Sequence, residues 1–401
     1  MENPKIRFKG FTKDWEQRKL GELVGIYDGV HQTPDYQDSG IMFLSVENIA
    51  TLKSEKYISE AAFERDYKVY PEKGDILMTR IGDVGTTNVV ETAEKVAFYV
   101  SLALLKPNGI DSYFLSNAMK TNPFLKGLRE RTLVTAIPQK INKDEIGKID
   151  IFITNNDEEQ KKIGAYFHNL DHLITLHQRK CEQTKKLKKY MLQKMFPRNG
   201  AKVPEIRFYG FTYDWEQRKL GEVCSRVQGN DGRMDLPTLT ISAANGWMNQ
   251  EDRFSGNIAG KEQENYTLLH KGELSYNHGN SKLAKYGTVF SLQSYKEALV
   301  PRVYHSFKVE EGSPDFLEYY FATKLPDREL GKLISSGARM DGLLNIGYNE
   351  FMGIQMLFPS VEEQKQISNY FRNLDHLITL HQRKCDELKK MKKYMLQNMF
   401  I

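Results

Sequence analysis

Two histidine–cysteine pairs are the sharpest chemical signal in this sequence. His177 is followed four residues later by Cys181, and His381 is followed at the same spacing by Cys385. Residues at positions i and i+4 share one face of a helix, and two histidines with two cysteines form a common zinc ligand set. Small, weakly polar side chains in the contact face of a helix can instead set its register. We favour that interpretation and predict no metal.

Motifs for catalysis are missing from the sequence. It has no glycine-rich loop ending in Lys-Ser or Lys-Thr, which would hold the phosphates of ATP. It also lacks the Asp/Asn-Pro-Pro-aromatic tetrapeptide of amino-methyltransferases and the patterns GxSxG and HExxH. Acidic and lysine residues are scattered without a convincing nuclease spacing. We therefore expect no catalytic residue and no cofactor in this chain.

The chain is instead organised as an internal repeat. Residues 4–23 return as residues 204–223 with 16 of 20 positions identical, and residues 159–196 return as residues 363–400 with 29 of 38 identical. The segments between them share little with each other. Uniform drift after a duplication would blur all segments alike. The contrast indicates a common frame that holds two parts with different tasks.

A long helix is predicted in each copy of the second repeated segment. Residues 158–195 contain no proline, and their apolar positions alternate spacings of four and three, which is a heptad contact face. These positions are Ile163, Phe167, Leu170 and Ile174, followed in the second copy by Ile367, Phe371, Leu374 and Ile378. Internal pseudo-two-fold symmetry would pair the helices antiparallel. At about 1.5 Å per residue each would span roughly 57 Å, so the pair can act as a ruler.

The segments between the repeats combine short strands, glycine turns and helices. Strands are predicted at residues 41–46, 75–78 and 149–153, and helices at residues 112–119 and 316–324. The predicted fold is therefore α/β in the α+β sense, with two mixed domains joined by two long antiparallel coiled-coil helices. The predicted domains are residues 1–157 and 198–361, with spacer helices at residues 158–197 and 362–401.

Composition and charge limit the function classes. The 401 residues exceed one ordinary core, and the mean hydropathy of −0.56 argues against membrane residence. Three scattered cysteines do not form a disulfide framework, so we expect a cytoplasmic protein. The net charge is +5, but residues 159–196 carry +6 and residues 363–400 carry +4. The remaining residues carry −5, so any contact with a polyanion must come from local patches.

The interleaved repeat resembles the specificity subunit of type I restriction-modification enzymes over nearly the whole chain. The resemblance is carried by RFxGFTxDWEQRKLGE in both copies, by KGD and KGE turns in the variable segments, and by EEQK at the start of each long helix. It implies two target-recognition domains, each binding one half of a split site in double-stranded DNA. It also implies that two methyltransferase subunits using S-adenosylmethionine, and restriction subunits using ATP and magnesium, perform the chemistry.

Polar loops supply the candidate DNA-binding residues. Arginine can bridge the two acceptors of guanine, whereas asparagine and glutamine match the edge of adenine. In the first variable segment the candidates are His31, Gln32, Thr33, Arg80, Arg131 and Gln139. In the second they are Arg233, Asn277, His278, Asn280, Lys282 and Arg339. A solvated surface loop is the alternative for each. Trp15 and Trp215 lie in repeated segments, which cannot distinguish two half-sites, so we expect structural roles for them.

Two other functions are compatible with parts of the pattern. The heptads and the weak overall charge would also suit a coiled-coil adaptor whose variable domains bind proteins. A self-sufficient nuclease has only the association of the family with cleavage in its favour. Sequence-specific protection of DNA would separate the first alternative from DNA recognition, and magnesium-dependent cutting by the chain alone would reveal the second.

Overall fold

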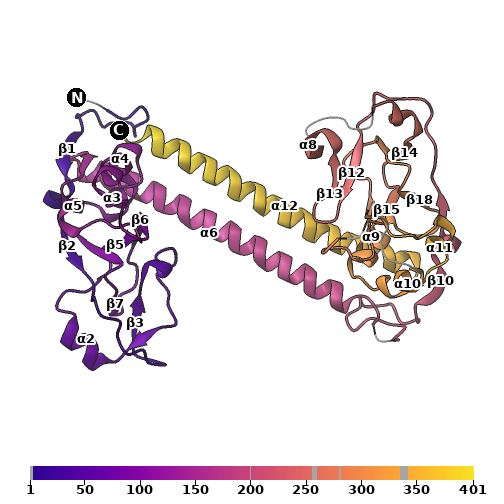
Figure 1. Ribbon diagram of the computed structural model, residues 1–401, viewed down its shortest axis with the longest axis horizontal. Coiled ribbons are helices and arrows are strands. Elements are labelled where there is room, and N and C mark those ends of the chain that lie inside the picture. The colour runs from indigo at the N-terminus through magenta and orange to yellow at the C-terminus, as the bar shows by residue number, and fades with distance from the viewer. Residues whose placement is uncertain (1–2, 199, 255–259, 280, 335–341) are drawn as a thin grey trace. The chain divides into compact units, whose positions relative to one another are not determined.

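The computed structural model describes residues 3–198, 200–254, 260–279, 281–334 and 342–401 (Figure 1). The chain packs as two compact units. Unit 1 comprises Met1–Arg179 with His381–Ile401, and unit 2 comprises Lys180–Leu380. Each unit thus contains one variable segment and parts of both long helices. The four-part division predicted from the sequence separates the helices from the globular parts and stays a prediction.

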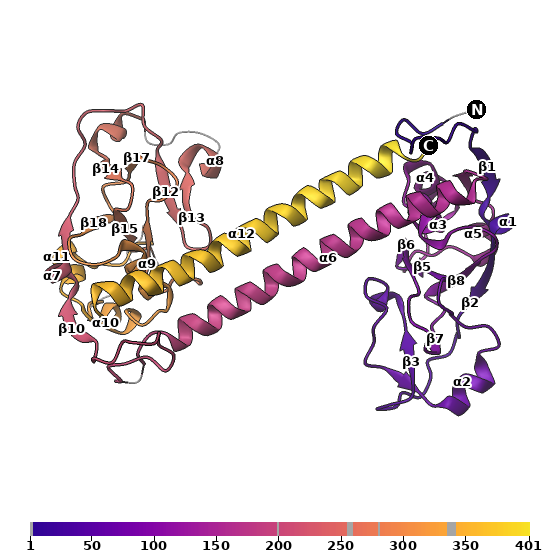
Figure 2. The same ribbon diagram turned by 180° about the vertical axis from the view of Figure 1, so that it is seen from behind.

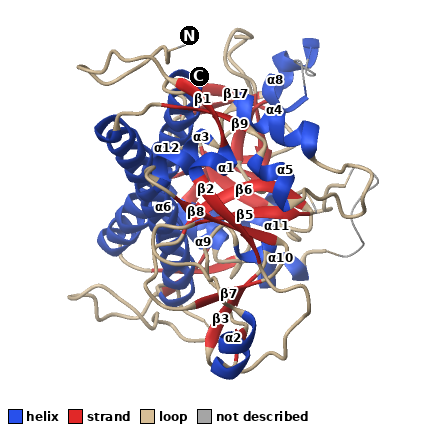
Figure 3. Cartoon of the chain, turned by 90° about the vertical axis from the view of Figure 1, so that its left-hand side faces the viewer, coloured by secondary structure: helices blue, strands red, loops and turns tan. Residues whose placement is uncertain are grey.

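Unit 1 is built on three small sheets. A four-stranded sheet has the order β2–β8–β5–β6, a three-stranded sheet has the order β4–β3–β7, and β1 pairs with β9. The three-stranded sheet lies at one end of the larger sheet (Figure 3). The strands are β1 Glu16–Lys19, β2 Val24–Asp28, β3 Ile41–Leu44, β4 Tyr57–Ile58, β5 Ile76–Ile81, β6 Asp83–Val89, β7 Val96–Phe98, β8 Leu102–Pro107 and β9 Asp150–Ile153.

Short helices cover the sheets of unit 1, and two of them, α2 and α3, start at a side-chain cap. The Asp111 carboxylate accepts a hydrogen bond from the Phe114 N–H at 2.8 Å and begins α3. The helices are α1 Leu20–Leu23, α2 Glu60–Asp66, α3 Ser112–Ala118, α4 Asn122–Arg131, α5 Lys143–Gly147 and α6 Asp157–Lys194, of which α6 continues into unit 2.

Unit 2 repeats this plan with different strands. A four-stranded sheet has the order β11–β18–β15–β16, and three two-stranded sheets pair β10 with β19, β12 with β13, and β14 with β17. The strands are β10 Glu216–Lys219, β11 Cys224–Arg226, β12 Leu239–Ser242, β13 Gly246–Asn249, β14 Thr267–His270, β15 Leu274–Asn277, β16 Thr288–Ser291, β17 Glu297–Val300, β18 His305–Val309 and β19 Gln355–Phe358. The helices are α7 Leu220–Val223, α8 Gln250–Phe254, α9 Pro314–Ala322, α10 Asp327–Lys332, α11 Tyr348–Met352 and α12 Val361–Asn398, of which α12 continues into unit 1.

Within each unit, the segments of α6 and α12 lie side by side and run antiparallel (Figures 1 and 2). In unit 1 the Lys392 ammonium lies 2.5 Å from the Asp171 carboxylate, and His177 faces His381. Residues of higher number in α6 contact residues of lower number in α12, so the two segments run antiparallel. In unit 2 the Lys188 ammonium lies 2.6 Å from the Asp375 carboxylate in the same sense.

A buried ion pair attaches the start of each long helix to the N-terminal repeat of its unit. Arg7 donates two hydrogen bonds to Glu159, at 2.5 and 2.8 Å, and this pairing raises the pKa of Arg7. Arg207 makes the same two contacts with Glu363, both at 2.7 Å. Both glutamate side chains are almost fully buried, so each requires its arginine. This contact explains why RF and EEQK recur together.

An aromatic cluster closes the core of each unit around the last residues of a long helix. In unit 1, Phe400 lies 5.8 Å from Trp15 and 5.7 Å from Phe167, between ring centroids. In unit 2, Phe196 lies 6.0 Å from Trp215 and 6.2 Å from Phe371. Both tryptophans are buried, at 3% and 1% exposure, so they fill the core and cannot stack on bases.

The predicted fold class is confirmed. Both long helices are present, and the variable segments form mixed units with small sheets. The predicted strands at residues 41–46, 75–78 and 149–153 correspond to β3, β5 and β9, and the predicted helices at residues 112–119 and 316–324 correspond to α3 and α9. The ends of these elements differ from prediction by at most three residues.

Candidate nucleic-acid interface

The loop after β2 presents polar groups at the surface of unit 1. His31, Gln32 and Thr33 are exposed, and they border a hollow of about 690 Å³ together with Arg65 and Tyr67. The backbone of the loop is held at its start, because the Val30 N–H donates to the Phe98 carbonyl at 3.2 Å. Exposed donors and acceptors on a fixed backbone are what contact with base edges requires.

A second loop of unit 1 lies between Arg131 and Gln139. Its two ends are joined, since the Leu133 N–H donates to the Lys140 carbonyl at 2.8 Å. Gln139 is tied to Gly82, which accepts from its side chain at 3.0 Å and donates to its carbonyl at 2.9 Å. Arg131 lies 4.0 Å from Glu145 and is partly buried.

The tip of this second loop is apolar. Ile137 is fully exposed, and Val134 is 69% exposed. Exposed apolar side chains on an anchored loop are unusual in a protein that acts alone, and DNA-binding proteins insert such groups between base steps. Reasoning from motifs missed these residues because it considered only polar side chains. The exposed run Leu133–Ile137 beside Arg131 was the available signal.

Arg80 and His278 occupy equivalent positions in the two units, and both are buried, at 7% and 5% exposure. Each lies at the end of an inner strand of its four-stranded sheet, β5 or β15. The Arg80 carbonyl accepts from the Ile141 N–H at 3.0 Å, and the His278 carbonyl accepts from the Leu344 N–H at 2.8 Å. Both residues therefore pair through their carbonyls with a later segment of the chain, at Ile141 in unit 1 and at Leu344 in unit 2.

The side chains of Arg80 and His278 bind groups of their own units. The Arg80 guanidinium pairs with Asp28 of β2, and burial lowers the pKa of Arg80. The His278 ring lies with Nδ1 2.7 Å from the Leu344 carbonyl oxygen and Nε2 3.0 Å from that of Val303. Both side chains are mostly buried, and their predicted contacts with bases stay predictions.

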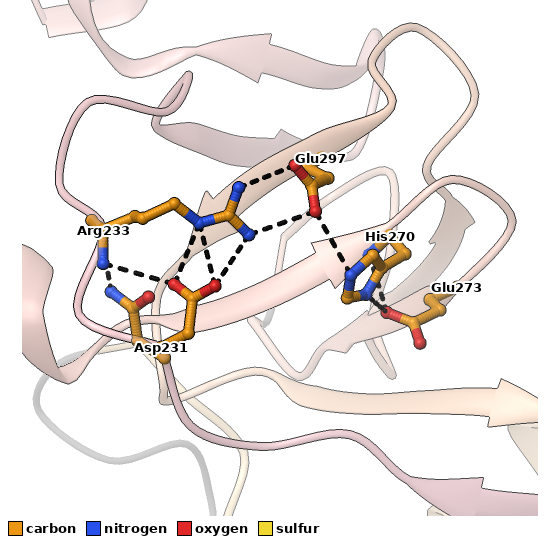
Figure 4. A network of polar contacts seen from close by, with 6 residues as sticks. Asp231, Arg233, His270, Glu273 and Glu297 are labelled. Atoms are coloured by element: carbon orange, nitrogen blue, oxygen red, sulfur yellow. Dashed lines mark hydrogen bonds and ion pairs between the residues drawn. The ribbon is translucent and has the colours of Figure 1, made fainter.

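Arg233 of unit 2 is held in a network of carboxylates (Figure 4). Its guanidinium lies 2.8 Å from both Asp231 and Glu297, which raises its pKa. His270 joins the network 3.3 Å from Glu297 and 3.5 Å from Glu273. The Arg233 side chain stays 39% exposed, so a phosphate or a base would have to compete with two carboxylates for it.

The remaining candidates of unit 2 lie around the end of β15. Asn277 is partly buried, and its side chain donates to the Ile241 carbonyl at 3.3 Å and accepts from the Gly279 N–H at 3.0 Å. Lys282 is exposed. Asn280 and Arg339 lie outside the described residues.

Residues 12–186 match the model of a protein family described as the type I restriction modification DNA specificity domain. The repeat carries the same frame into the second half of the chain. The first half of the chain carries a type I restriction-modification specificity domain. The chain is 22% identical over 96% of its length to a Methanocaldococcus jannaschii protein described as the MjaX specificity subunit of a type I restriction enzyme, 92% of which is covered.

The fold of the chain also matches a solved structure. The S subunit of a type I restriction-modification system from M. genitalium superposes with a TM-score of 0.65, at 13% sequence identity. The match covers 100% of this chain and 99% of that one. The whole architecture of frame and variable units is thus shared at the level of the fold.

The predicted heptad contact face of the long helices divides into two kinds of contact. The first turns of each long helix are buried in the core of their own unit, through Ile163, Phe167, Leu170 and Ile174 in unit 1 and through Ile367, Phe371 and Leu374 in unit 2. Ile378 is partly exposed, and its carbonyl oxygen lies 3.8 Å from the Cys181 sulfur. Most of the contact face therefore anchors the helices to the globular parts.

The two histidines of the candidate zinc set lie in contact, but the two cysteines belong to different units. His177 Nδ1 lies 3.0 Å from His381 Nδ1, so one ring donates to the other. Cys385 is buried in unit 1 and Cys181 in unit 2. Among the residues that the structure describes, no three or more His, Cys, Asp or Glu side chains are grouped to hold a metal ion. Within the same residues, no helix has the length and apolar character needed to cross a membrane.

Proposed function

We propose that this chain binds a split site in double-stranded DNA, with one half-site contacted by the loops of each unit. The observation that carries the proposal is that the two units share their frame and differ in their loops. The frame is shared, since the ion pair Arg7–Glu159 of unit 1 returns as Arg207–Glu363 in unit 2. The residues at the ends of β5 and β15 differ, since Arg80 pairs with Asp28 whereas His278 contacts the Leu344 carbonyl. Different half-sites present different donor and acceptor patterns, so they need different loops on one scaffold.

Named surfaces in each unit support this reading. In unit 1 these are the loop with His31, Gln32 and Thr33 and the loop from Arg131 to Gln139 with Ile137 at its tip. In unit 2 they are Arg233 and Lys282, which keep exposed cationic groups. Polar side chains would contact base edges, the apolar tip would contact a base step or a thymine methyl group, and the lysines would contact phosphates.

We propose further that the chain is not an enzyme and directs partner subunits to the site. Two methyltransferase subunits would use S-adenosylmethionine, and restriction subunits would use ATP and magnesium. The two long helices would set the distance between the half-sites. The excess charge of the helix segments, +6 and +4, supports contact of these helices with DNA or with acidic partner surfaces.

Methylome sequencing of cells with and without this gene tests the proposal. The expected result is one split motif that is methylated only when the gene is present, with two unlike halves and a fixed gap. An unchanged methylome in cells that express matching methyltransferase subunits would contradict DNA recognition. It would favour an adaptor whose variable units bind proteins.

A further inference from the structure

Unit 1 contains a pocket lined by four lysines. It has a volume of about 420 Å³ and is lined by residues at the start of α4 and in the last turns of α12. Lys120 and Asn122 contribute one wall, and the other wall includes Lys389, Lys392 and Lys393. Four cationic side chains around one pocket repel each other unless anions lie among them.

One carboxylate of the chain offsets part of this charge. Asp171 of α6 lies 2.5 and 2.7 Å from the Lys392 ammonium. The ammonium of Lys120 has no hydrogen bond or ion pair with any residue that the structure describes. Partial burial, reinforced by the charge of Lys392, lowers the pKa of Lys120 to about 8. Lys120 is therefore mostly protonated at neutral pH, and an anion next to it would stabilise the charged form.

The charged side chains of the pocket favour an anion. All four are ammonium groups, and Ile401, which ends the chain with its main-chain carboxylate, also lines the pocket. Lysine acts as a compact point charge and pairs readily with phosphate oxygens. The N-terminal end of the ten-residue helix α4 also borders the pocket, and the helix dipole favours negative charge there.

The equivalent place in unit 2 is built differently. Gln160 accepts from the backbone N–H of Asp111 in unit 1, and Gln364 accepts from that of Ser313 in unit 2, which aligns α3 with α9. This alignment puts Ala322 where unit 1 has Lys120.

In unit 2 a tyrosine contacts both members of the corresponding ion pair. The Tyr319 hydroxyl donates to Asp375 at 2.9 Å, and its ring lies 5.1 Å from the Lys188 ammonium. Asp375 and Lys188 correspond to Asp171 and Lys392 in the repeat. The fourth lysine is therefore a feature of unit 1 and is not required by the shared frame.

We propose that the lysine pocket of unit 1 binds one phosphate of the DNA backbone, with Lys120 as its principal contact. The proposal rests on the proposed function, because it takes duplex DNA as the ligand. Phosphate contacts contribute affinity and position without carrying sequence information. This contact would therefore strengthen binding to all duplexes alike and would fix the position of unit 1 on its half-site.

The test compares salt dependence in the complex with the methyltransferase subunits. The variants are Lys120→Ala, which copies Ala322, Lys120→Arg, which keeps the charge, and Lys126→Ala on the exposed face of α4 as the control. Each is titrated with a duplex carrying the methylated motif and with a random duplex of equal length, over a series of KCl concentrations. Lys120→Ala should weaken both by about tenfold at low salt and lower the slope of log K against log [KCl] by about one. Lys120→Arg and Lys126→Ala should keep the slope.

A chemical footprint gives a second readout that needs no substitution. Acetylation of lysines in the unmodified complex, followed by mass spectrometry, should modify Lys120 without DNA and spare it with DNA, while Lys126 reacts equally in both. An unchanged slope for Lys120→Ala, or equal acetylation of Lys120 with and without DNA, would overturn the proposal. Weaker assembly with the methyltransferase subunits at an unchanged slope would also overturn it, in favour of an acidic protein segment. Failure of the complex to prefer its motif would instead contradict the proposed function.

Discussion

Unit 1 and unit 2 share one frame and differ at the places where that frame meets the variable loops. The ion pair between the N-terminal repeat and a long helix has the same geometry in both, and Trp15 and Trp215 are packed alike. Beneath the loops, a buried arginine in unit 1 corresponds to a buried histidine in unit 2. The frame therefore fixes the ends of the helices and the pairing of the strands. The buried residues beneath the loops can differ between the two units.

Lengthening both long helices should have the largest effect, because it changes the frame and leaves the loops of both units unchanged. Four residues inserted between Arg179 and Lys180, and four between Leu380 and His381, leave the contacts described within each unit intact. The insertion adds about 6 Å, or about two base pairs of duplex, to the distance between the half-sites. Methylome sequencing should show both half-sites unchanged and a longer gap, with methylation of the original site lost. An unchanged gap would show that the helices do not set it.

Breaking the ion pair tests whether the frame is equivalent in the two units. Arg7→Leu leaves Glu159 buried without a partner, and Arg207→Leu does the same to Glu363, so each should reduce the free energy of unfolding by about 3–5 kcal/mol. Urea unfolding followed by pulse proteolysis and peptide mass spectrometry assigns the loss to a unit. The double variant Arg7→Leu/Glu159→Leu should recover most of the stability. A loss in only one unit would break the equivalence.

Glu318 gives the units different pH dependence. Burial raises its pKa to about 6, while unit 1 has Ser116 at the equivalent position. A carboxyl whose pKa is higher when folded stabilises the fold below its unfolded pKa and loses this contribution as pH rises through about 6. Glu318→Gln should therefore stabilise unit 2 by about 2 kcal/mol at pH 7.5 and have little effect near pH 4.5, as measured by urea unfolding at both values. Equal effects at the two pH values, or a change in unit 1, would contradict this assignment.

The exposed apolar side chains should give the smallest effect. Ile137→Ala removes the loop tip of unit 1, and Leu283→Ala removes an equally large side chain that is 68% exposed in unit 2. Each should weaken binding of its own half-site by about fivefold, since part of a side chain's apolar area is lost from the contact. Competition binding with duplexes mutated in one half-site distinguishes the two. Equal weakening of all duplexes by Ile137→Ala would argue against a contact with bases.

The sequence predicted the frame well and the candidate interface only partly. Repeats and heptads locate the long helices because buried positions carry apolar residues at a regular spacing. The structural role of the two tryptophans was predicted from their place in the repeat. The exposure of polar residues near a loop depends on tertiary contacts that pattern does not show. Arg80 and His278 read as loop residues, but Asp28 and the carbonyls of Leu344 and Val303 hold them in the interior. Ile137 was overlooked because an apolar residue is ordinarily expected in a core.

Exchange of one variable segment tests the central claim most directly. Residues 24–158 are replaced by the corresponding segment of another member of the specificity family, and the methylome is sequenced in cells that supply the methyltransferase subunits. Two unlike readers on one frame predict that one half of the motif changes while the other half and the gap stay the same. An unchanged motif, or a change in both halves at once, would contradict the account.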